Sequence, residues 1–362
     1  MKTILALLGM AIITFSLSGC ISKQKVTENA NVEVITMLKP KGMSGIEQIV
    51  DKYEKMHNNV IIKIVEITDD TNEVYKTYTA TLDRKDSDID IYLIDEIWTE
   101  EFAKSGYLEP LGLELSGEKY EPKAIEMFTS EDTVYALPFA FDIGILFYRK
   151  DRVDKAPIHW GDVINGNPQP IFTMKEDEDL LCESIELGRY LKAAYPYFVE
   201  QGKDGCDNLK NRFKKGDINY YRGWSKEYAY FDDYDFEIGG NVGVMIPDMP
   251  VLGGYGFAIS GFSENKKTAR DFLAYMSDNR NIREMMKIER YIPVQKEFLT
   301  DKMFVDYNPC MREIENTIKR AVIRNSNDQY IKKAWALQKE IYTAICENKE
   351  PPEFKEIYIK EN

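Results

Sequence analysis

The first hundred residues alternate between strand-like and helix-like hydrophobic patterns. Apolar runs at 32–38 and 60–67 predict two strands, and the almost wholly apolar run 89–94 predicts a third strand that is covered on both faces. A helix is expected near 72–82, between the second and third strands. Between the first two strands, apolar residues recur with the spacing of one helix face: Ile46, Ile49, Val50 and Tyr53. This alternation is typical of an α/β fold.

Capping and turn signals delimit some of these elements. The segment 39–42 is turn-like, and Ser44 with Glu47 has the spacing of a capping box at the start of the first helix. Much later, Ser263 is placed to cap another helix. The apolar face of that helix comprises Ala269, Phe272, Leu273 and Met276.

Other segments have weaker signals. Runs at 143–148, 241–246 and 257–260 predict strands, and the charged run 175–179 predicts a solvated loop. From residue 301 the pattern is helical as far as the paired prolines at 351 and 352. We find no internal repeat and no long low-complexity segment.

The N-terminus has the pattern of an export signal. Lys2 precedes an apolar run from Ile4 to Phe15, which is too short to span a bilayer, and small residues follow it. The sequence LSGC ending at Cys20 resembles a bacterial lipobox. That resemblance implies a signal peptide at 1–19 and attachment of a diacylglycerol to the Cys20 thiol. We therefore expect residues 20–31 to be a lipid anchor and tether, which places the folded part outside the cytoplasmic membrane.

Length and composition exclude several classes of protein. The chain after the signal is too long for one ordinary core and predicts two lobes. A formal net charge of −14 argues against a nucleic-acid partner, which requires concentrated cationic surface. No later stretch is long and apolar enough to cross a bilayer.

Metal and cofactor signals are weak. The only histidines, His57 and His159, are far apart in sequence. Residues 233, 235 and 237 alternate like the ligands of a calcium loop, but Ile238 replaces the glycine that such a loop needs. Four cysteines follow Cys20 without any CxxC pair: Cys182, Cys206, Cys310 and Cys346. We expect them to be buried free thiols, although export permits disulfides, and we expect no metal and no cofactor.

Several islands of sequence occur in a recognisable order. They are IYLIDEIW at 91–98, EFA at 101–103, GYLEPL at 106–111, YALPFAFD at 135–142, LFYRKD at 146–151, RGW at 222–224 with Tyr228, GNVG at 240–243, and LGGYGFAIS at 252–260. In this order and spacing they resemble the family 1 extracellular solute-binding proteins of ABC importers. The similarity is greatest to the maltose- and trehalose-type sugar-binding members.

The resemblance implies an α/β protein with a two-lobed, periplasmic-binding-protein-like fold of type II. Lobe 1 would comprise 32–140 plus 253–300, and lobe 2 would comprise 141–252 plus 301–362. A hinge would join the lobes, and a carbohydrate bound in the cleft between them would be enclosed by hinge closure. The implied partners are the membrane permease subunits, and the protein would act as a monomer without converting its ligand.

The implied binding residues combine carboxylates with aromatic rings. An ionised carboxylate accepts hydrogen bonds from sugar hydroxyls, and a flat ring packs against the C–H faces of a sugar. Asp95, at the carboxyl end of a strand, and Asp142 would be the acceptors. The alternatives are a helix N-cap for Asp95 and a hinge-stabilising role for Asp142. Trp224 would stack on the ligand, with a core position as its alternative.

The glycines of LGGYGFAIS raise a separate question, because glycine weakens a strand. By the resemblance, Gly253, Gly254 and Gly256 would let the backbone approach the ligand, and Tyr255 would supply a wall of the site. The family commonly has tryptophan at the position of Tyr255. The alternative is a bend where the chain re-enters the first lobe.

Two further candidate residues and one difference from the family pattern leave the identity of the ligand open. Tyr228, one helical turn beyond Trp224, would either contact the ligand or pack internally. Lys39 would donate to ligand oxygens. Gln295 stands where many sugar-binding relatives have arginine, so the usual disaccharide set is in doubt.

Two other functions fit parts of the sequence. A surface lipoprotein that senses a ligand and reports to a receptor would have the same anchor and cleft. A secreted glycosidase would need paired carboxylates, which an acidic chain contains in any case.

Overall fold

The fold is built on a mixed β-sheet whose main strands lie in the order β10-β7-β12-β3-β1-β2. It is seen in a computed structural model, which describes residues 32–164, 168–174, 178–200, 209–231, 238, 240–326 and 330–353. Two short strand pairs, β5 with β6 and β8 with β9, lie outside this sheet. The sheet and the helices around it form the α/β architecture that the sequence predicts.

The first five elements match the hydrophobic pattern. They are β1 (Glu33–Pro40), α1 (Gly45–Met56), β2 (Val60–Ile67), α2 (Thr71–Asp83) and β3 (Ile91–Asp95). β1 pairs in parallel with β2 and with β3, as right-handed crossovers predict. The predicted apolar face of α1 is buried against the sheet and against α11. Burying each large apolar side chain stabilises the fold by about 1.5–3 kcal/mol.

Both predicted side-chain caps are wrong. Ser44 precedes α1, but its side chain makes no capping hydrogen bond; instead a carboxylate oxygen of Glu289 accepts from the N–H of Gly45 at 2.5 Å. The N-cap of α10 is Asn265, two residues after Ser263. The Ser263 hydroxyl instead donates to Asp90 at 2.5 Å. Tertiary partners supply hydrogen bonds that local spacing cannot reveal.

Two long strands were predicted only in part. β7 (Ala136–Arg149) is buried along nearly its whole length, and β12 (Val251–Ser260) includes the glycine-rich stretch. The two strands pair antiparallel, with a register shift between Tyr255 and Gly256, where Gly256 lies opposite Pro138. Proline and glycine weaken strand signals, so the pattern predicted only the more regular ends of these strands.

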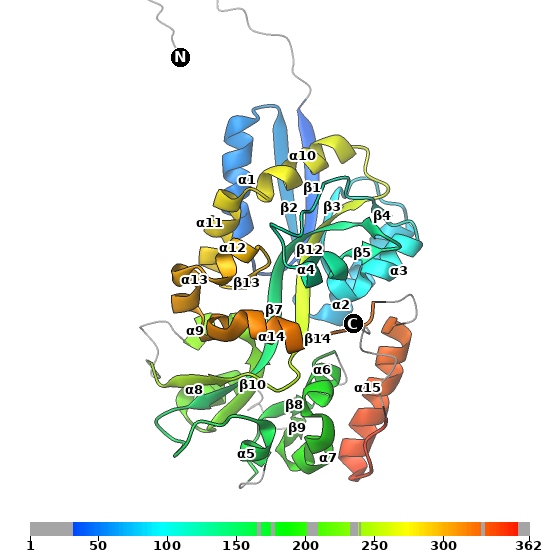
Figure 1. Ribbon diagram of the computed structural model, residues 1–362. Coiled ribbons are helices and arrows are strands. Elements are labelled where there is room, and N and C mark those ends of the chain that lie inside the picture. The colour runs from blue at the N-terminus through cyan, green and yellow to red at the C-terminus, as the bar shows by residue number, and fades with distance from the viewer. Residues whose placement is uncertain are drawn as a thin grey trace, which may run out of the picture.

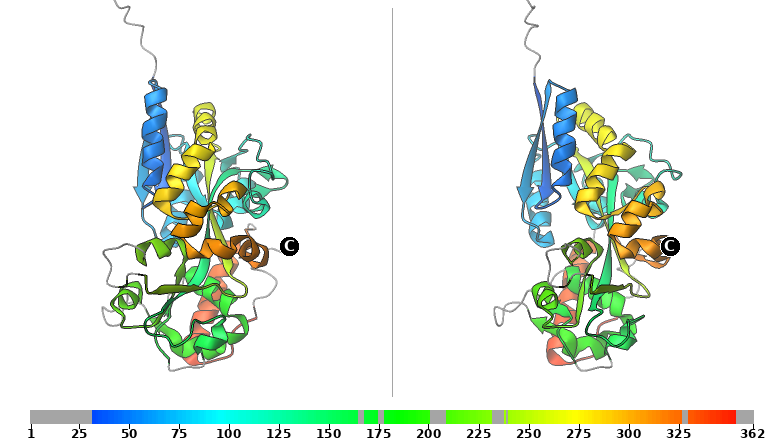
Figure 2. Two further views of the ribbon diagram at one scale, coloured as in Figure 1. Left: turned by 60° about the vertical axis from the view of Figure 1, so that its left-hand side comes forward. Right: turned by 90° about the vertical axis from the view of Figure 1, so that its left-hand side faces the viewer.

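β7 connects the two ends of the molecule. Its first half pairs with β12, and its second half pairs with β10 (Tyr220–Trp224) and β11 (Val242–Met245). Figure 1 shows β1, β2, β3, α1 and α10 (Lys266–Met276) at one end, with α5, α7, β8 and β9 at the other. The views in Figure 2 show the same separation. The residue boundaries of the two lobes stay a prediction.

The remaining helices and strands are shorter, apart from the last helix. They are η1 (Glu96–Trp98), α3 (Thr99–Lys104), β4 (Leu108–Glu109), α4 (Pro122–Met127), β5 (Thr129–Ser130), β6 (Thr133–Val134), α5 (Trp160–Ile164), β8 (Phe172–Met174), α6 (Glu178–Leu187), η2 (Gly188–Tyr190), α7 (Leu191–Ala194), η3 (Tyr195–Tyr197), β9 (Phe198–Glu200), α8 (Leu209–Lys215), η4 (Ser225–Glu227), α9 (Tyr228–Phe231), α11 (Asn279–Glu289), β13 (Ile292–Pro293), α12 (Lys296–Leu299), α13 (Lys302–Tyr307), η5 (Pro309–Glu313), α14 (Ile314–Arg320), β14 (Val322–Ile323) and α15 (Tyr330–Glu347).

The last third differs from its prediction in one respect that matters for the site. β14 interrupts the segment that was predicted to be helical, and it pairs in parallel with the first residues of β12. The predicted loop 175–179 is also partly wrong, because α6 includes Glu178 and Asp179.

The cysteine prediction holds in part. Cys182 and Cys310 are buried free thiols, whereas Cys346 is an exposed free thiol at the end of α15. Cys206, the calcium-like alternation at 233–237 and residues 1–31 lie outside the described residues. In the described part of the chain, no helix combines the length and apolarity that a membrane span requires.

Candidate functional site

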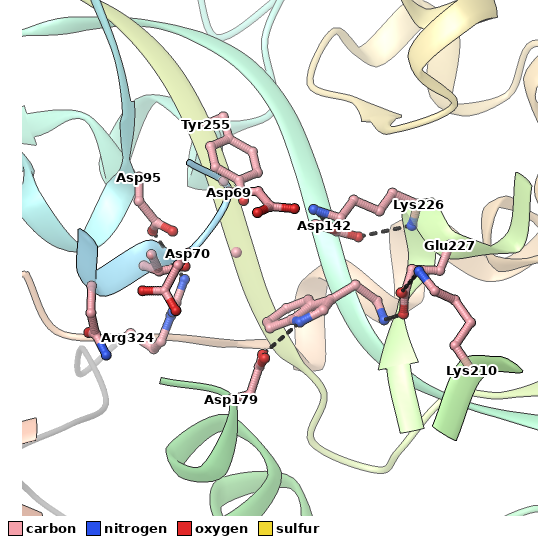
Figure 3. A pocket seen from close by; sticks show the side chains of 15 residues that line it. Asp69, Asp70, Asp95, Asp142, Asp179, Lys210, Lys226, Glu227, Tyr255 and Arg324 are labelled. Carbon is pink, nitrogen blue, oxygen red and sulfur yellow. Dashed lines mark hydrogen bonds and ion pairs between the residues drawn. The ribbon is translucent and has the colours of Figure 1, made fainter. Parts of the chain in front are cut away.

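A polar cavity of about 370 Å³ lies where β3, β7 and β12 meet β10, η4 and α6. Five of the predicted site residues line it: Asp95, Asp142, Trp224, Gly254 and Tyr255. The other lining residues are Asp69, Asp70, Thr71, Asn72, Asp179, Lys210, Lys226, Glu227, Gly253 and Arg324. Figure 3 shows Asp95 and Asp142 on either side of Tyr255, with Asp179 across the cavity.

Strand register explains why the predicted residues meet. β12 lies between β3 and β7, and Tyr255 is paired with Asp95 while Gly253 is paired with Asp142. On the other side of β7, Trp224 is paired with Gly144 at the end of β10. Four strands that are distant in sequence therefore bring these side chains to one cavity.

Asp95 is held by a buried arginine. Its Oδ1 accepts from Nη2 of Arg324 at 3.2 Å and from the N–H of Ile97 at 3.4 Å, so the predicted N-cap alternative is realised within the cavity wall. Arg324 also donates to Oε1 of Glu96, from Nε at 3.0 Å and from Nη2 at 2.5 Å. Burial raises the pKa of Glu96, while the positive charge of Arg324 opposes that shift.

Asp142 is buried at the point where β7 changes its pairing partners. Its Oδ1 accepts from the Ser225 hydroxyl at 2.6 Å and from the N–H groups of Ile143 and Lys226, each at 3.1 Å. Its Oδ2 lies 3.8 Å from Nζ of Lys226. Oδ1 thus joins β7 to η4, and Oδ2 faces the Lys226 ammonium; the hinge-stabilising role stays a prediction.

Trp224 is oriented from two directions. Its indole Nε1 donates to Oδ1 of Asp179 at 2.9 Å, and the Arg222 guanidinium lies over its ring at 4.5 Å from the centroid. Arg222 is itself fixed by Glu186, with N–O distances of 3.0 and 3.1 Å. Because one face of the indole is covered by Arg222, a ligand can stack only on the other face.

The glycines of β12 serve packing more than ligand approach. A Cβ on Gly254 would lie 2.9 Å from Sδ of Met127, and a Cβ on Gly256 would lie 2.7 Å from the Phe128 ring. The Gly254 N–H donates to Glu96 at 2.8 Å, so it is not a donor for a ligand. Gly253 has more space, with its nearest side-chain atoms at 3.3 and 3.7 Å.

Three predicted residues do not line the cavity. Gly256 packs against Phe128, and Tyr228 lines a separate depression beside β11. Lys39 is fully buried at the end of β1, where its ammonium pairs with Glu66 at 2.5 Å and donates to the Gly42 carbonyl. The predicted turn at 39–42 is also shorter than expected, because β1 continues through Pro40.

Some missed residues had an available signal. Asp69 and Asp70 lie just after the carboxyl end of β2, and Asp95 is the last residue of β3. Ligands collect at the carboxyl ends of strands, and this argument, which predicted Asp95, applies equally to Asp69 and Asp70. Lys226 and Glu227 follow Trp224 directly. Arg324 had no such signal, because its position depends on β14, which the pattern did not predict.

The cavity is built to accept hydrogen bonds. Six carboxylates and three cations line it, and two of those cations, Arg324 and Lys210, are within 3.2 Å of carboxylate oxygens. Within the described residues, no three histidine, cysteine or acidic side chains are grouped as a metal site requires. Its volume is at the lower end of the range for small-molecule sites, which suits a ligand of one or two sugar rings.

Comparisons with known proteins agree on one family. Two family models described as "Bacterial extracellular solute-binding protein" match residues 39–181 and 172–309. A probable ABC transporter-binding protein of Deinococcus radiodurans is 21% identical over 370 residues, covering 86% of this chain and 87% of that protein.

Solved structures share the fold along most of the chain. Maltose-bound MalE3 of T. maritima has a TM-score of 0.76 at 19% identity, covering 88% of this chain and 96% of that one. An ABC transporter solute-binding protein of Agrobacterium radiobacter K84, in complex with ribitol, has a TM-score of 0.75 at 15% identity, covering 89% and 96%. One from Thermotoga lettingae, bound with α-D-tagatose, has a TM-score of 0.74 at 17% identity, covering 88% and 96%.

Proposed function

This chain belongs to the bacterial extracellular solute-binding proteins, and from that premise we propose that it captures a small carbohydrate or polyol for an ABC importer. The ligand is bound without chemical conversion and is delivered to the membrane permease. Relatives named as binding proteins, rather than as enzymes, support this role. The solved neighbours hold maltose, ribitol and tagatose, all of them neutral polyhydroxylated molecules.

The observation that carries the proposal is the meeting of acids and rings in one cavity. Asp95 and Tyr255 come from adjacent strands of the sheet, and Trp224 comes from β10 beyond the point where β7 changes partners. A ligand that touches both groups stabilises the arrangement in which they are close together, because only differential affinity shifts a conformational balance. This geometry supports the proposal that a hinge closes around the ligand.

The proposed location is the outer face of the cytoplasmic membrane, with Cys20 as the lipid attachment site. A monomer anchored through the 20–31 tether would remain close to its permease. A Cys20→Ser variant should leave the membrane fraction and lose incorporation of labelled fatty acid. A variant that stays in the membrane fraction with its label would contradict this anchor.

Thermal unfolding with a panel of neutral probes tests the function. Maltose, ribitol, D-tagatose and D-mannitol are added to the protein, and at least one should raise its melting temperature while remaining chemically unaltered. At a ligand concentration of 100 times the Kd, binding adds about 2.7 kcal/mol to the free energy of unfolding. Release of a hydrolysis product from maltose would instead indicate an enzyme.

Two aromatic variants locate the site. At the probe concentration that saturates the wild type, Trp224→Ala should abolish the ligand-induced rise, because the stacking surface is lost, while the ligand-free protein changes only slightly. Tyr228→Ala is the matched control, since Tyr228 belongs to the neighbouring segment but lines a different depression. Loss of the rise in Tyr228→Ala and its retention in Trp224→Ala would place the ligand outside this cavity.

A further inference from the structure

Hydrogen-bond donors are scarce in a cavity that is rich in acceptors. The Trp224 indole donates to Asp179, and the Gly254 N–H donates to Glu96. Among the cations, Arg324 is bonded to Asp95 and Glu96, and Lys210 donates to Glu227 at 2.7 Å. The remaining donors for a ligand oxygen are the neutral side chains of Thr71, Asn72 and Tyr255 and the lysine ammonium groups.

Lys226 is the cation of this cavity that has no carboxylate oxygen within hydrogen-bonding distance. Its ammonium has three N–H groups, and one of them is directed at the Tyr291 hydroxyl at 3.3 Å. Its closest carboxylate oxygen, Oδ2 of Asp142, is 3.8 Å away, which is beyond hydrogen-bonding distance. The Lys226 side chain is 36% exposed and lines the cavity, so a ligand can reach it.

The same ammonium lies among groups that would attract any cation. It is 5.8 Å from the Tyr255 ring centroid and 5.4 Å from the Tyr291 ring centroid, with the Asp142 carboxylate beside it. Burial raises the pKa of Tyr291 to about 12, so its hydroxyl is neutral and does not add a charge. Figure 3 shows Lys226 reaching toward Asp142 beside Tyr255.

We propose that Lys226 determines ligand specificity by donating a hydrogen bond to a ligand oxygen and by excluding a ligand ammonium from the pocket formed by Asp142, Tyr255 and Tyr291. A neutral ligand oxygen accepts from the ammonium, while a charged amine at the same position is repelled by it. Asp142 and the two tyrosines then form a cation site that the protein fills with its own side chain. This inference rests on the proposed function, because it concerns the ligand of the same cavity.

The test compares Lys226→Met with the wild type. The neutral probe that gives the wild type its largest thermal shift is studied by calorimetry, together with its set of monodeoxy and monoamino analogues. Lys226→Met should weaken binding of the parent probe about 10- to 100-fold, as loss of one hydrogen bond from a charged group predicts. The deoxy analogue that lacks the contacted oxygen should lose little further affinity in this variant.

The decisive result is a gain of binding. The amino analogue substituted at that same position should bind Lys226→Met at least about 10-fold more tightly, relative to the parent probe, than it binds the wild type. Structural damage alone cannot produce such a reversal. Lys226→Arg should retain most of the affinity for the parent probe, and Lys267→Met, which removes an 88% exposed surface lysine, should match the wild type.

Failures of the two proposals differ. A Lys226→Met variant with wild-type affinities, or one that weakens the parent and every analogue equally, would overturn the specificity role while leaving sugar binding intact. A wild-type protein that responds to none of the neutral probes would contradict the proposed function, and the role of Lys226 falls with it.

Discussion

The two carboxylate oxygens of Asp142 have different partners. Oδ1 accepts three hydrogen bonds, two of which join β7 to η4, and Oδ2 lies 3.8 Å from the Lys226 ammonium. The groups that face this carboxyl are Lys226, Ser225, Glu227, Tyr255, Tyr291 and Cys310. Burial raises the pKa of Asp142 above its usual 3.8, in opposition to the Lys226 charge.

Replacing Asp142 by asparagine should therefore alter the pH dependence of stability. A folded-state pKa above the unfolded value means that the stabilising contribution of the carboxyl is complete below about pH 4 and is lost as the pH rises through the folded-state pKa. Asparagine does not titrate, and its Oδ1 can still accept the same hydrogen bonds. The free energy of unfolding of Asp142→Asn, relative to wild type, should thus increase with pH.

Urea unfolding at several pH values from about 4 to about 8 measures this difference. Its slope cannot exceed about 1.4 kcal/mol per pH unit, the limit for one proton. An Asp217→Asn variant is the control, because it makes the same substitution at an exposed position. A difference that falls as the pH rises would show that Lys226, rather than burial, dominates the environment of Asp142.

At the scale of elements, β12 shows that packing against neighbouring side chains can require glycine within a strand. The strand is buried between β3 and β7, with Met127 and Phe128 of the α4 region pressed against it. Gly254 leaves room for Met127, and Gly256 leaves room for Phe128. Of the three glycines, only Gly253 adjoins Trp224 and Arg324 in the cavity.

Alanine substitutions should separate packing from binding. Gly256→Ala places a methyl group 2.7 Å from the Phe128 ring and should cost about 1–3 kcal/mol of stability through overpacking. Gly253→Ala meets nothing closer than 3.3 Å, so its stability should change much less, while its methyl group enters the cavity and weakens ligand binding. Urea unfolding and calorimetry measure the two effects.

The matched pair also tests the alternative reading of these glycines. If Gly256→Ala kept wild-type stability but lost ligand affinity, the stretch would serve close approach by the ligand, as the resemblance first implied. If Gly253→Ala were the more destabilised variant, the packing assignment of the two positions would be wrong.

Sequence patterns predicted elements well where local periodicity governs them. The βαβαβ start and the apolar faces of α1 and α10 are confirmed, because each depends on residues within one segment. β7 and β12 were predicted only in part, since their proline and glycine positions make sense only beside a partner strand. The predicted caps Ser44 and Ser263 failed for the same reason, because Glu289 accepts from the Gly45 N–H and the Ser263 hydroxyl donates to Asp90, and both partners are distant in sequence.

At the scale of the whole molecule, the site required the complete topology. Motif resemblance singled out Asp95, Asp142, Trp224 and Tyr255, and the sheet brings all four to one cavity. Arg324 could not be found in this way, because it reaches Asp95 only through the pairing of β14 with β12. The charge balance of the cavity therefore follows from long-range contacts and not from any single motif.

The whole-molecule expectation is that ligand binding makes the protein more compact. Asp95 is on β3, which pairs with β12, and Trp224 is on β10, which pairs with the second half of β7. A ligand that bridges these two residues favours the closed arrangement. Small-angle scattering of the wild type should give a smaller radius of gyration with the best neutral probe than without it. Asp95→Asn and Trp224→Ala should each remove most of that change.

Closure requires the ligand to contact both Asp95 and Trp224, whereas binding alone does not. If other contacts also bridged the two sides, either variant would keep part of the compaction at a saturating probe concentration. If the ligand bridges both sides, saturation of a single variant stabilises the protein without closing it, because the remaining contacts are equally good in the open and closed arrangements. Compaction that survives in Trp224→Ala at full occupancy would contradict the assignment of this indole to the closing face of the cavity.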